Sequence, residues 1–522
     1  MKKPNSFRSI MAGALLVLAG ATFPSVQAQQ THESKWPRGV TYEIFVQSFA
    51  DSNGDGIGDI KGMTSKLDYL QNLGVEAVWL MPMNPSPSYH KYDVTDYYGI
   101  HPDYGTMEDF KAFIQEAHKR NIKVVMDMVL NHSSSEHPWF KAALKDENSP
   151  YREYYVWTHK NDPQTQKEGK TTGADSFNTQ HWHKVEGSDY LYYGYFTGGM
   201  PDLNYDSPKL REEVFKIGRF WFSEVGVDGF RLDAARHIFP DERPTDNHNW
   251  WVYFRNEMKK ANKDVYLVGE VWAPADIVGP YLKGLPALFN FDMGFAITKA
   301  VNEEEAGDLV ANHKKIRDFY QNVNPEYVDA TFLTNHDQNR IMSAVNGDVN
   351  KAKMATALLL TLPGSPYLYY GEEIGMKGMK PDENIREPFL WDTKAKDKNR
   401  TTWMQPKYNA EGAVKPLAAQ LKDKNSMYNH YKAFLQLRNN SQALTYGELE
   451  PLNLNTKGLS AFVRSNEQQS LLVMHNLSKE AITVNLPQNL AEYGKVYFKN
   501  KAAKVSKNTV SIPAYSTVIL QK

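Results

Sequence analysis

Short apolar stretches alternate along the central part of this chain with longer stretches in which apolar residues repeat every three to four positions. The short stretches are typical of buried strands, and the longer ones of amphipathic helices. This alternation predicts βα units and a parallel sheet. We expect strands at 40–47, 76–81, 122–128, 227–233, 265–271, 286–291, 328–333 and 366–370, with helices at 63–73, 107–120, 208–225, 249–262, 307–321 and 350–362.

Eight strands over this length suit a (β/α)8 TIM barrel, an α/β fold, and an open doubly wound sheet is the alternative. Residues 133–206 break the rhythm, because they are rich in Tyr, Trp, His and Gly without a helical period. We interpret them as an excursion inserted after the third strand. Residues 442–522 instead carry short β-type runs at 460–464, 470–476, 481–486 and 509–520, which predict a C-terminal antiparallel β-sandwich. The barrel domain then comprises residues 29–132 and 207–441.

The N-terminus carries a pattern typical of a secretory signal peptide. Lys2, Lys3 and Arg8 precede an apolar stretch at 10–23, and small residues up to Ala28 suit a cleavage site. A membrane anchor is the alternative, but the stretch is too short to span a bilayer comfortably. We therefore expect residues 1–28 to be a signal peptide and the protein to be secreted or periplasmic, without a later membrane span.

Composition excludes several classes of function. The 522 residues carry a formal net charge of -1, so no basic field favours a nucleic-acid partner. The chain has no cysteine, which excludes disulfides, thiolate metal sites and a cysteine nucleophile. No feature of the sequence indicates an obligate protein partner.

Polar clusters follow four of the predicted strands: DMVLNH, GFRLDAARH, GEVW and FLTNHD. A parallel barrel gathers catalytic groups at the carboxyl ends of its strands. Cleavage of a glycosidic bond needs a carboxylic acid and a second carboxylate, and Asp233, Glu270 and Asp337 can supply them. Arg231 should favour the ionised form of Asp233, and burial beside Trp272 should raise the pKa of Glu270. A strand-end aspartate alone more often caps a helix, so the ordered set carries the prediction.

Alternate oxygen donors in DSNGDGIGD predict a calcium site. The donors are Asp51, Asn53, Asp55, the Ile57 carbonyl and Asp59. Hard oxygen ligands on a glycine-rich loop suit Ca²⁺, and the spacing resembles the start of an EF-hand loop. Position twelve is glycine rather than glutamate, however, and the alternative is a turn without metal.

Taken together, these motifs resemble the α-amylase family, glycoside hydrolase family 13, over nearly the whole chain. The resemblance implies that Asp233 is the nucleophile, Glu270 the general acid/base and Asp337 the transition-state stabiliser of a retaining mechanism. It also implies that the excursion and the sandwich correspond to domains B and C of that family. Sugar-binding residues implied in the same way are Tyr92, His132, Arg231 and His336, and a possible second calcium site comprises Asn131, Asp202 and the His237 carbonyl.

The preferred bond and substrate are also implied by resemblance. Ala234 resembles members that act on α-1,4 bonds, and Arg236 and His237 stand where amylases contact sugar beyond the cut. Asp93 and Arg386 instead resemble a pair that grips the chain end in exo-acting α-glucosidases, unless they form a structural ion pair.

The sequence is most similar to bacterial α-amylases, with features intermediate to oligo-1,6-glucosidases and neopullulanases. We expect an enzyme that cleaves internal α-1,4 bonds of starch and maltooligosaccharides. The alternatives are an exo-acting α-glucosidase, an oligo-1,6-glucosidase or a transglycosylase on the same scaffold. A non-catalytic starch-binding protein and a calcium-dependent adhesion module are further alternatives from other classes of protein.

Overall fold

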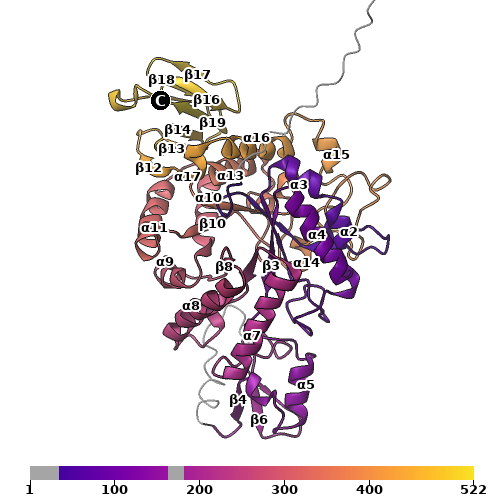
Figure 1. The fold of residues 1–522 in the computed structure, drawn as a ribbon. Coiled ribbons are helices and arrows are strands. Elements are labelled where there is room, and N and C mark those ends of the chain that lie inside the picture. The colour runs from indigo at the N-terminus through magenta and orange to yellow at the C-terminus, as the bar shows by residue number, and fades with distance from the viewer. Residues whose placement is uncertain (1–33, 163–180) are drawn as a thin grey trace, which may run out of the picture. The chain divides into compact units, whose positions relative to one another are not determined.

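A computed structural model describes residues 34–162 and 181–522 of the protein (Figure 1). The signal peptide predicted at 1–28 lies outside the described residues. Among the residues that are described, none of the helices combines the length and the apolar character needed to cross a bilayer.

Eight parallel strands form a closed barrel, as the alternation of strands and helices predicts. Each strand pairs with its neighbours in chain order, and β1 closes the ring by pairing with β11, with Thr41 opposite Tyr367. This closing pair excludes the open doubly wound sheet. The strands are β1 (Thr41–Ile44), β2 (Ala77–Leu80), β3 (Lys123–Met128), β7 (Gly229–Leu232), β8 (Tyr266–Gly269), β9 (Ala287–Asn290), β10 (Val328–Phe332) and β11 (Ser365–Tyr369).

Alternation along each strand decides which side chains enter the barrel. In β7, Phe230 and Leu232 join the large core between the strands and the surrounding helices. Arg231 lies between them in sequence, so its side chain points to the opposite face, into the barrel. The apolar filling of the interior is a separate cluster that includes Trp79, Phe289, Phe332 and Tyr367.

Helices surround the barrel, and several differ from the predicted ranges. The stretch predicted at 63–73 is two helices, because Asp59 caps an early one with a hydrogen bond from the Gly62 amide. Pro244 lies in the first turn of α8, which starts earlier than expected. The helix predicted at 208–225 is α-helical only up to Phe220 and ends in a π-helical turn, Trp221–Val225. The helices around the barrel include α2 (Ile60–Thr64), α3 (Leu67–Leu73), α4 (Met107–Lys119), α7 (Pro208–Phe220), α8 (Pro244–Ala261), α10 (Phe291–Glu303), α11 (Leu309–Val323), α13 (Val349–Thr361) and α16 (Met427–Asn439).

Two of these helices, α10 and α16, are absent from the predicted set. Shorter helices lie mainly in the connections between the larger elements. They are α1 (Val46–Phe49), α9 (Ala275–Val278), α12 (Ile341–Ala344), α14 (Asp382–Ile385), α15 (Leu417–Gln420) and α17 (Gln442–Tyr446).

The excursion between β3 and β7 has secondary structure of its own. It contains α5 (Pro138–Lys145), which the sequence pattern did not reveal, and a small antiparallel sheet. The strands of this sheet are β4 (Trp157–His159), β5 (Trp182–Lys184) and β6 (Tyr190–Tyr193), with β6 in the centre. An isolated bridge between His132 and Asp202 joins the two ends of the excursion beside the barrel.

The C-terminal region forms two antiparallel sheets, as predicted. One core cluster draws apolar side chains from both sheets, including Met474 and Leu520 from the larger and Val510 and Ile512 from the smaller. This shared core makes the region a sandwich. The larger sheet has β12 (Glu448–Leu452), β13 (Leu459–Ser465), β14 (Ser470–Asn476), β19 (Ser516–Gln521) and β16 (Lys495–Lys499), and the smaller has β15 (Ile482–Asn485), β18 (Thr509–Ile512) and β17 (Lys504–Ser506).

Candidate active site

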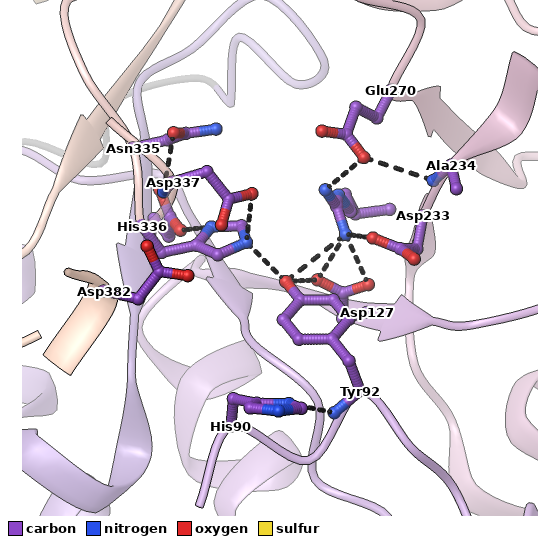
Figure 2. A network of polar contacts seen from close by, with 12 residues as sticks. His90, Tyr92, Asp127, Asp233, Ala234, Glu270, Asn335, His336, Asp337 and Asp382 are labelled. Atoms are coloured by element: carbon purple, nitrogen blue, oxygen red, sulfur yellow. Dashed lines mark hydrogen bonds and ion pairs between the residues drawn. The ribbon is translucent and has the colours of Figure 1, made fainter. Parts of the chain in front are cut away.

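The predicted catalytic carboxylates follow three strands of the barrel. Asp233 comes directly after β7, Glu270 directly after β8, and Asp337 lies in the loop after β10. Because all strands of the barrel are parallel, these positions share the carboxyl end of the barrel. Figure 2 shows the three side chains around one network of polar contacts.

Arg231 joins two of these carboxylates. Its Nη1 donates to Asp233 Oδ1 at 2.6 Å, and its Nη2 donates to Glu270 Oε2 at 2.8 Å (Figure 2). Both nitrogens belong to one planar guanidinium, so the two carboxyl groups lie at a single site. Nη1 also donates to both oxygens of Asp127, on β3, at 3.0 and 3.1 Å. The arginine is 1% exposed, and its pKa stays well above the ordinary value because these carboxylates outweigh the effect of burial.

Glu270 lies in surroundings that favour its protonated form. Burial raises the pKa of its carboxyl, and the negative charge of Asp233 adds to the rise, while Arg231 opposes it. The amide of Ala234 donates to Glu270 Oε2 at 3.1 Å. Ala234 has a φ of 45°, a left-handed conformation that costs a non-glycine residue on the order of 1–3 kcal/mol. This strained turn is what directs the amide at Glu270.

The Trp272 side chain, which the sequence places two residues after Glu270, packs on another aromatic ring. Its side chain is half exposed, and its ring stacks on Phe291 with centroids 4.4 Å apart and an interplanar angle of 12°. Phe291 in turn packs against Phe332, which belongs to the barrel interior. The indole therefore lies at the carboxyl end of the barrel and presents apolar surface to solvent.

Asp337 lies in surroundings that favour its ionised form. Burial works against the charge, but His336 and Arg386 outweigh it and hold the pKa of Asp337 well below its usual range. The contacts are 3.1 Å from His336 Nε2 to Oδ2 and 3.0 Å from Arg386 Nη2 to Oδ1. The site thus pushes the pKa values of Glu270 and Asp337 in opposite directions. Such a division is typical of catalytic carboxyl pairs.

Tyr92 lies in the same network. Its hydroxyl donates to Asp127 Oδ2 at 3.2 Å, and its ring is nearly parallel to that of His336, with centroids 5.5 Å apart. His132 Nε2 is 3.2 Å from the carbonyl of Tyr92, and burial lowers the pKa of His132, which favours its neutral form. The structure therefore brings Tyr92, His132 and His336 to the same site as the carboxylates.

Two of the other predicted sugar-binding residues, Arg236 and His237, have partners outside this network. Arg236 Nη2 pairs with Asp241 at 2.6 Å, and the His237 ring stacks on Tyr195 with centroids 4.1 Å apart. Both side chains are partly exposed.

Asp93 and Arg386 have separate partners instead of pairing with each other. Asp93 Oδ1 accepts from the hydroxyls of Ser86 and Ser88, whereas Arg386 Nη2 pairs with Asp337 and, at 3.1 Å, with Asp382. The structure places Arg386 on the catalytic carboxylate rather than on Asp93.

Two acidic residues of the network were missed as site residues by the sequence analysis. Asp127 binds Arg231, Tyr92 and Trp79, and Glu43, on β1, contacts His336 Nδ1 through Oε1 at 2.5 Å. A signal for both was present. Each is an acidic residue inside an otherwise apolar strand, in YEIF and in VVMDM.

The structure brings together the residues of the possible second calcium site. Asn131 Nδ2 lies 3.3 Å from Asp202 Oδ2 and 2.5 Å from the carbonyl oxygen of His237. The oxygen and nitrogen of an asparagine amide exchange by a simple flip, which would turn this contact into three converging oxygens. Burial raises the pKa of Asp202 to about 7. An oxygen-rich, buried set of this kind suits a hard cation.

The loop at 51–59 is held by its own side chains. Asp51 Oδ1 accepts from the amides of Asn53 and Gly54, and Asn53 and Asp55 accept in turn from amides two residues on. Asp59 accepts from Ser52 and caps α2. All the candidate ligands are oxygens, which fits calcium. Within the described residues, however, no three His, Cys, Asp or Glu side chains gather closely enough to define a metal site.

The arrangement combines the carboxyl group of Glu270, whose pKa is raised, with the carboxylate of Asp233, which is bound to Arg231. Such a pair can protonate a leaving oxygen and attack the carbon from which it departs. An acetal carbon is the target that needs both actions at once.

Two families match the chain. The family described as "Alpha amylase, catalytic domain" matches residues 43–447, and the one described as "Alpha-amylase SusG C-terminal domain" matches residues 459–519. "Alpha-amylase 3" of Dictyoglomus thermophilum is 45% identical over 94% of this chain and 94% of that protein. A "4-alpha-glucanotransferase" of Thermotoga neapolitana is 35% identical over 84% of this chain and 96% of that protein. The crystal structure of an α-amylase from H. orenii superposes with a TM-score of 0.85 at 42% identity, over 93% of this chain and 99% of that one.

Proposed function

Because this chain belongs to the α-amylase family of glycoside hydrolases, we propose that it cleaves the internal α-1,4 bonds of starch and maltooligosaccharides with retention of configuration. The protein is a glycoside hydrolase by its family. The bond, the internal position of the cut and the stereochemical course are the further steps of the proposal.

In this proposal Glu270 protonates the glycosidic oxygen while Asp233 attacks the anomeric carbon and forms a glycosyl ester. Glu270, now ionised, takes a proton from water, and the water releases the sugar from Asp233. Asp337 stabilises the positive charge that develops on the ring. The observation that supports this division is the shared guanidinium of Arg231, which contacts Asp233 Oδ1 and Glu270 Oε2 at 2.6 and 2.8 Å. Retaining enzymes bring their two carboxyl groups close together, whereas inverting ones leave room for a water between them, and a guanidinium shared by both groups favours the closer arrangement.

Cleavage inside the chain is supported by two features. A relative that covers 94% of this chain is named an α-amylase. Asp93 and Arg386, the pair that would grip a chain end, bind other partners. An exo-acting or oligo-1,6-specific enzyme is therefore less well supported.

A transglycosylase is the second candidate, and a specific observation favours it. A relative at 35% identity over 84% of this chain is named a 4-α-glucanotransferase. The half-exposed Trp272 ring could hold an acceptor sugar in competition with water. A non-catalytic starch-binding protein has no such support, because the carboxylates needed for hydrolysis are all present.

A time course of products from soluble starch, with maltose and isomaltose as parallel substrates, tests the proposal. Mixed maltooligosaccharides early in the reaction indicate internal cutting, and longer products formed from maltotriose indicate transfer. Glucose as the sole early product would overturn the amylase assignment. The variant Asp233→Asn should lower turnover by at least roughly 10⁴-fold with an unchanged fold. Near-normal turnover would mean that another group is the nucleophile.

We also propose that the protein binds calcium and is exported. Members of this family often bind calcium, and two oxygen-rich sets are candidates: the loop of Asp51, Asn53, Asp55, Ile57 and Asp59, and the set of Asn131, Asp202 and the His237 carbonyl. A cation at the second set would tie the excursion to the barrel. Export rests on the leader pattern at 1–28, and N-terminal sequencing of protein recovered from outside the cytoplasm tests it.

A further inference from the structure

Glu43 is a buried carboxylate inside the barrel. It lies on β1 beside Trp79 of β2 in the strand register, and it is 1% exposed. A buried charge is costly unless an opposite charge accompanies it. Within residues 34–162 and 181–522, the ion-pair partner that the structure gives it is His336, whose Nδ1 lies 2.5 Å from Glu43 Oε1.

The contacts of His336 place a proton on both ring nitrogens. Nδ1 faces the Glu43 carboxylate, and Nε2 faces Asp337 Oδ2 at 3.1 Å. Nε2 also lies 2.6 Å from the hydroxyl oxygen of Tyr92. That hydroxyl donates its one hydrogen to Asp127, so its oxygen accepts from His336. A neutral imidazole has a single N–H and cannot donate on both sides, whereas an imidazolium can.

We propose that Glu43 is a positioning residue for catalysis, which holds His336 as an imidazolium whose Nε2–H is directed at Asp337 and Tyr92. The inference rests on the proposed hydrolase function and extends it to a residue that does not touch substrate. Its action passes through His336: the fixed proton orients Asp337 and keeps that carboxylate ionised.

The charges around the imidazole agree with this assignment. Burial disfavours the imidazolium, but Asp337 and Glu43 outweigh it and raise the pKa of His336 to about 10. The side chain of Arg386 also contacts His336, because its Nε donates to the main-chain carbonyl of His336 at 3.0 Å. The titratable and charged groups that face the ring directly or through one contact are Glu43 from β1, Tyr92, Asp127 from β3, Arg231 from β7, Asp337 and Arg386.

The variant Glu43→Gln isolates the charge from the shape. A glutamine keeps the volume and offers a carbonyl oxygen to Nδ1–H, but it removes the negative charge. Loss of one neighbouring opposite charge should lower the pKa of His336 by about 1–3 units. Titration of ¹⁵N-histidine-labelled protein by NMR measures this, with the His336 signals assigned by their absence in His336→Gln.

Kinetics supply the second measurement. The ratio of kcat/KM for Glu43→Gln to that of the wild type, on a maltooligosaccharide, should be near one below the His336 pKa measured in the variant and should fall above it. Taking this ratio cancels the effect that titration of Glu270 has on kcat/KM, because both proteins contain Glu270. A ratio that is reduced equally at every pH, or an unchanged His336 pKa, would show a merely structural role and overturn the proposal.

Glu373→Gln is the matched control. Glu373 is also a buried glutamate, but it accepts from the hydroxyls of Tyr42 and Tyr69. We expect it to leave the His336 titration unchanged. If Glu43→Gln does not fold, the wild type alone decides, because a neutral His336 at pH 8 would refute the inference. The NMR result is independent of turnover, so it stands or fails separately from the proposed function, which the starch assay tests.

Discussion

Replacement of Arg464 by methionine should loosen the attachment of the C-terminal sandwich to the barrel. Arg464 lies on β13 and is 1% exposed. Its Nη1 donates to the Thr361 carbonyl at 2.6 Å, and its Nη2 donates to the carbonyls of Leu444 and Gly447, each at 2.9 Å. Thr361 is the last residue of α13, where carbonyls have no partner within the helix and a positive charge is favourable.

The size of the effect follows from these three bonds. A buried carbonyl left without a donor costs about 1–3 kcal/mol. The loss is partly offset, because the buried guanidinium carries a desolvation cost that lowers its own pKa well below the ordinary value. Methionine fills much of the same volume without a charge. We therefore expect a net destabilisation of about 2–4 kcal/mol.

Calorimetry and urea unfolding measure this change. We expect the unfolding of Arg464→Met to begin at a lower temperature and to separate into two transitions, because the sandwich loses one of its polar links to the barrel, the bond to Thr361. Hydrolysis at low temperature should stay unchanged, since Arg464 contacts none of the catalytic residues. Lys495→Met, on an exposed position of the same sheet, is the control. A loss of less than about 0.5 kcal/mol would refute the view that these bonds stabilise the interface.

Two further predictions concern pH and metal. Burial raises the pKa of Glu372 to about 8, so its charge increasingly penalises the folded state as pH rises from the ordinary glutamate value to that point. Glu372→Gln should consequently be more stable than wild type at pH 9 and nearly equal at pH 4, and a constant difference between the two unfolding midpoints would contradict this. Calcium should raise the unfolding temperature of the wild type more than that of Asp51→Asn, and chelation should reverse the gain. An equal response of both proteins would remove the loop at 51–59 as a binding site.

The barrel could be predicted because its information is local. Each strand is a short apolar run, and polar clusters follow four of them, so Asp233 and Glu270 could be placed at strand ends from sequence alone. Arg231 follows from the same alternation, since it lies between two apolar residues that face the helices. By contrast, the contact between Glu43 and His336 depends on the closure of the barrel. Glu43 meets His336 only because β1 closes the barrel against β11, near the strand that precedes His336.

Features that depend on distant pairing were harder to predict. The strands of the excursion are three or four residues long, too short for a periodicity to mark them, and β4 pairs with β6 across a wide separation in sequence. Asp93 and Arg386 were linked by resemblance, but local serines and the catalytic carboxylate satisfy them separately. Nor could the stacking of the Trp272 ring on Phe291 be predicted from the sequence.

Carboxyl groups outnumber cations around the end of the barrel. Asp127, Asp233 and Glu270 share the guanidinium of Arg231, and a second set of three acids contacts the other two cations: Glu43 and Asp337 contact His336, and Asp337 and Asp382 contact Arg386. This negative field contributes little to the binding free energy of an uncharged sugar before it reacts. A ligand that carries a positive charge where the sugar ring would lie is stabilised as soon as it binds. Protonated amines, including common amine buffers, should therefore behave as competitors of substrate, and rates measured in phosphate should exceed those measured in such buffers.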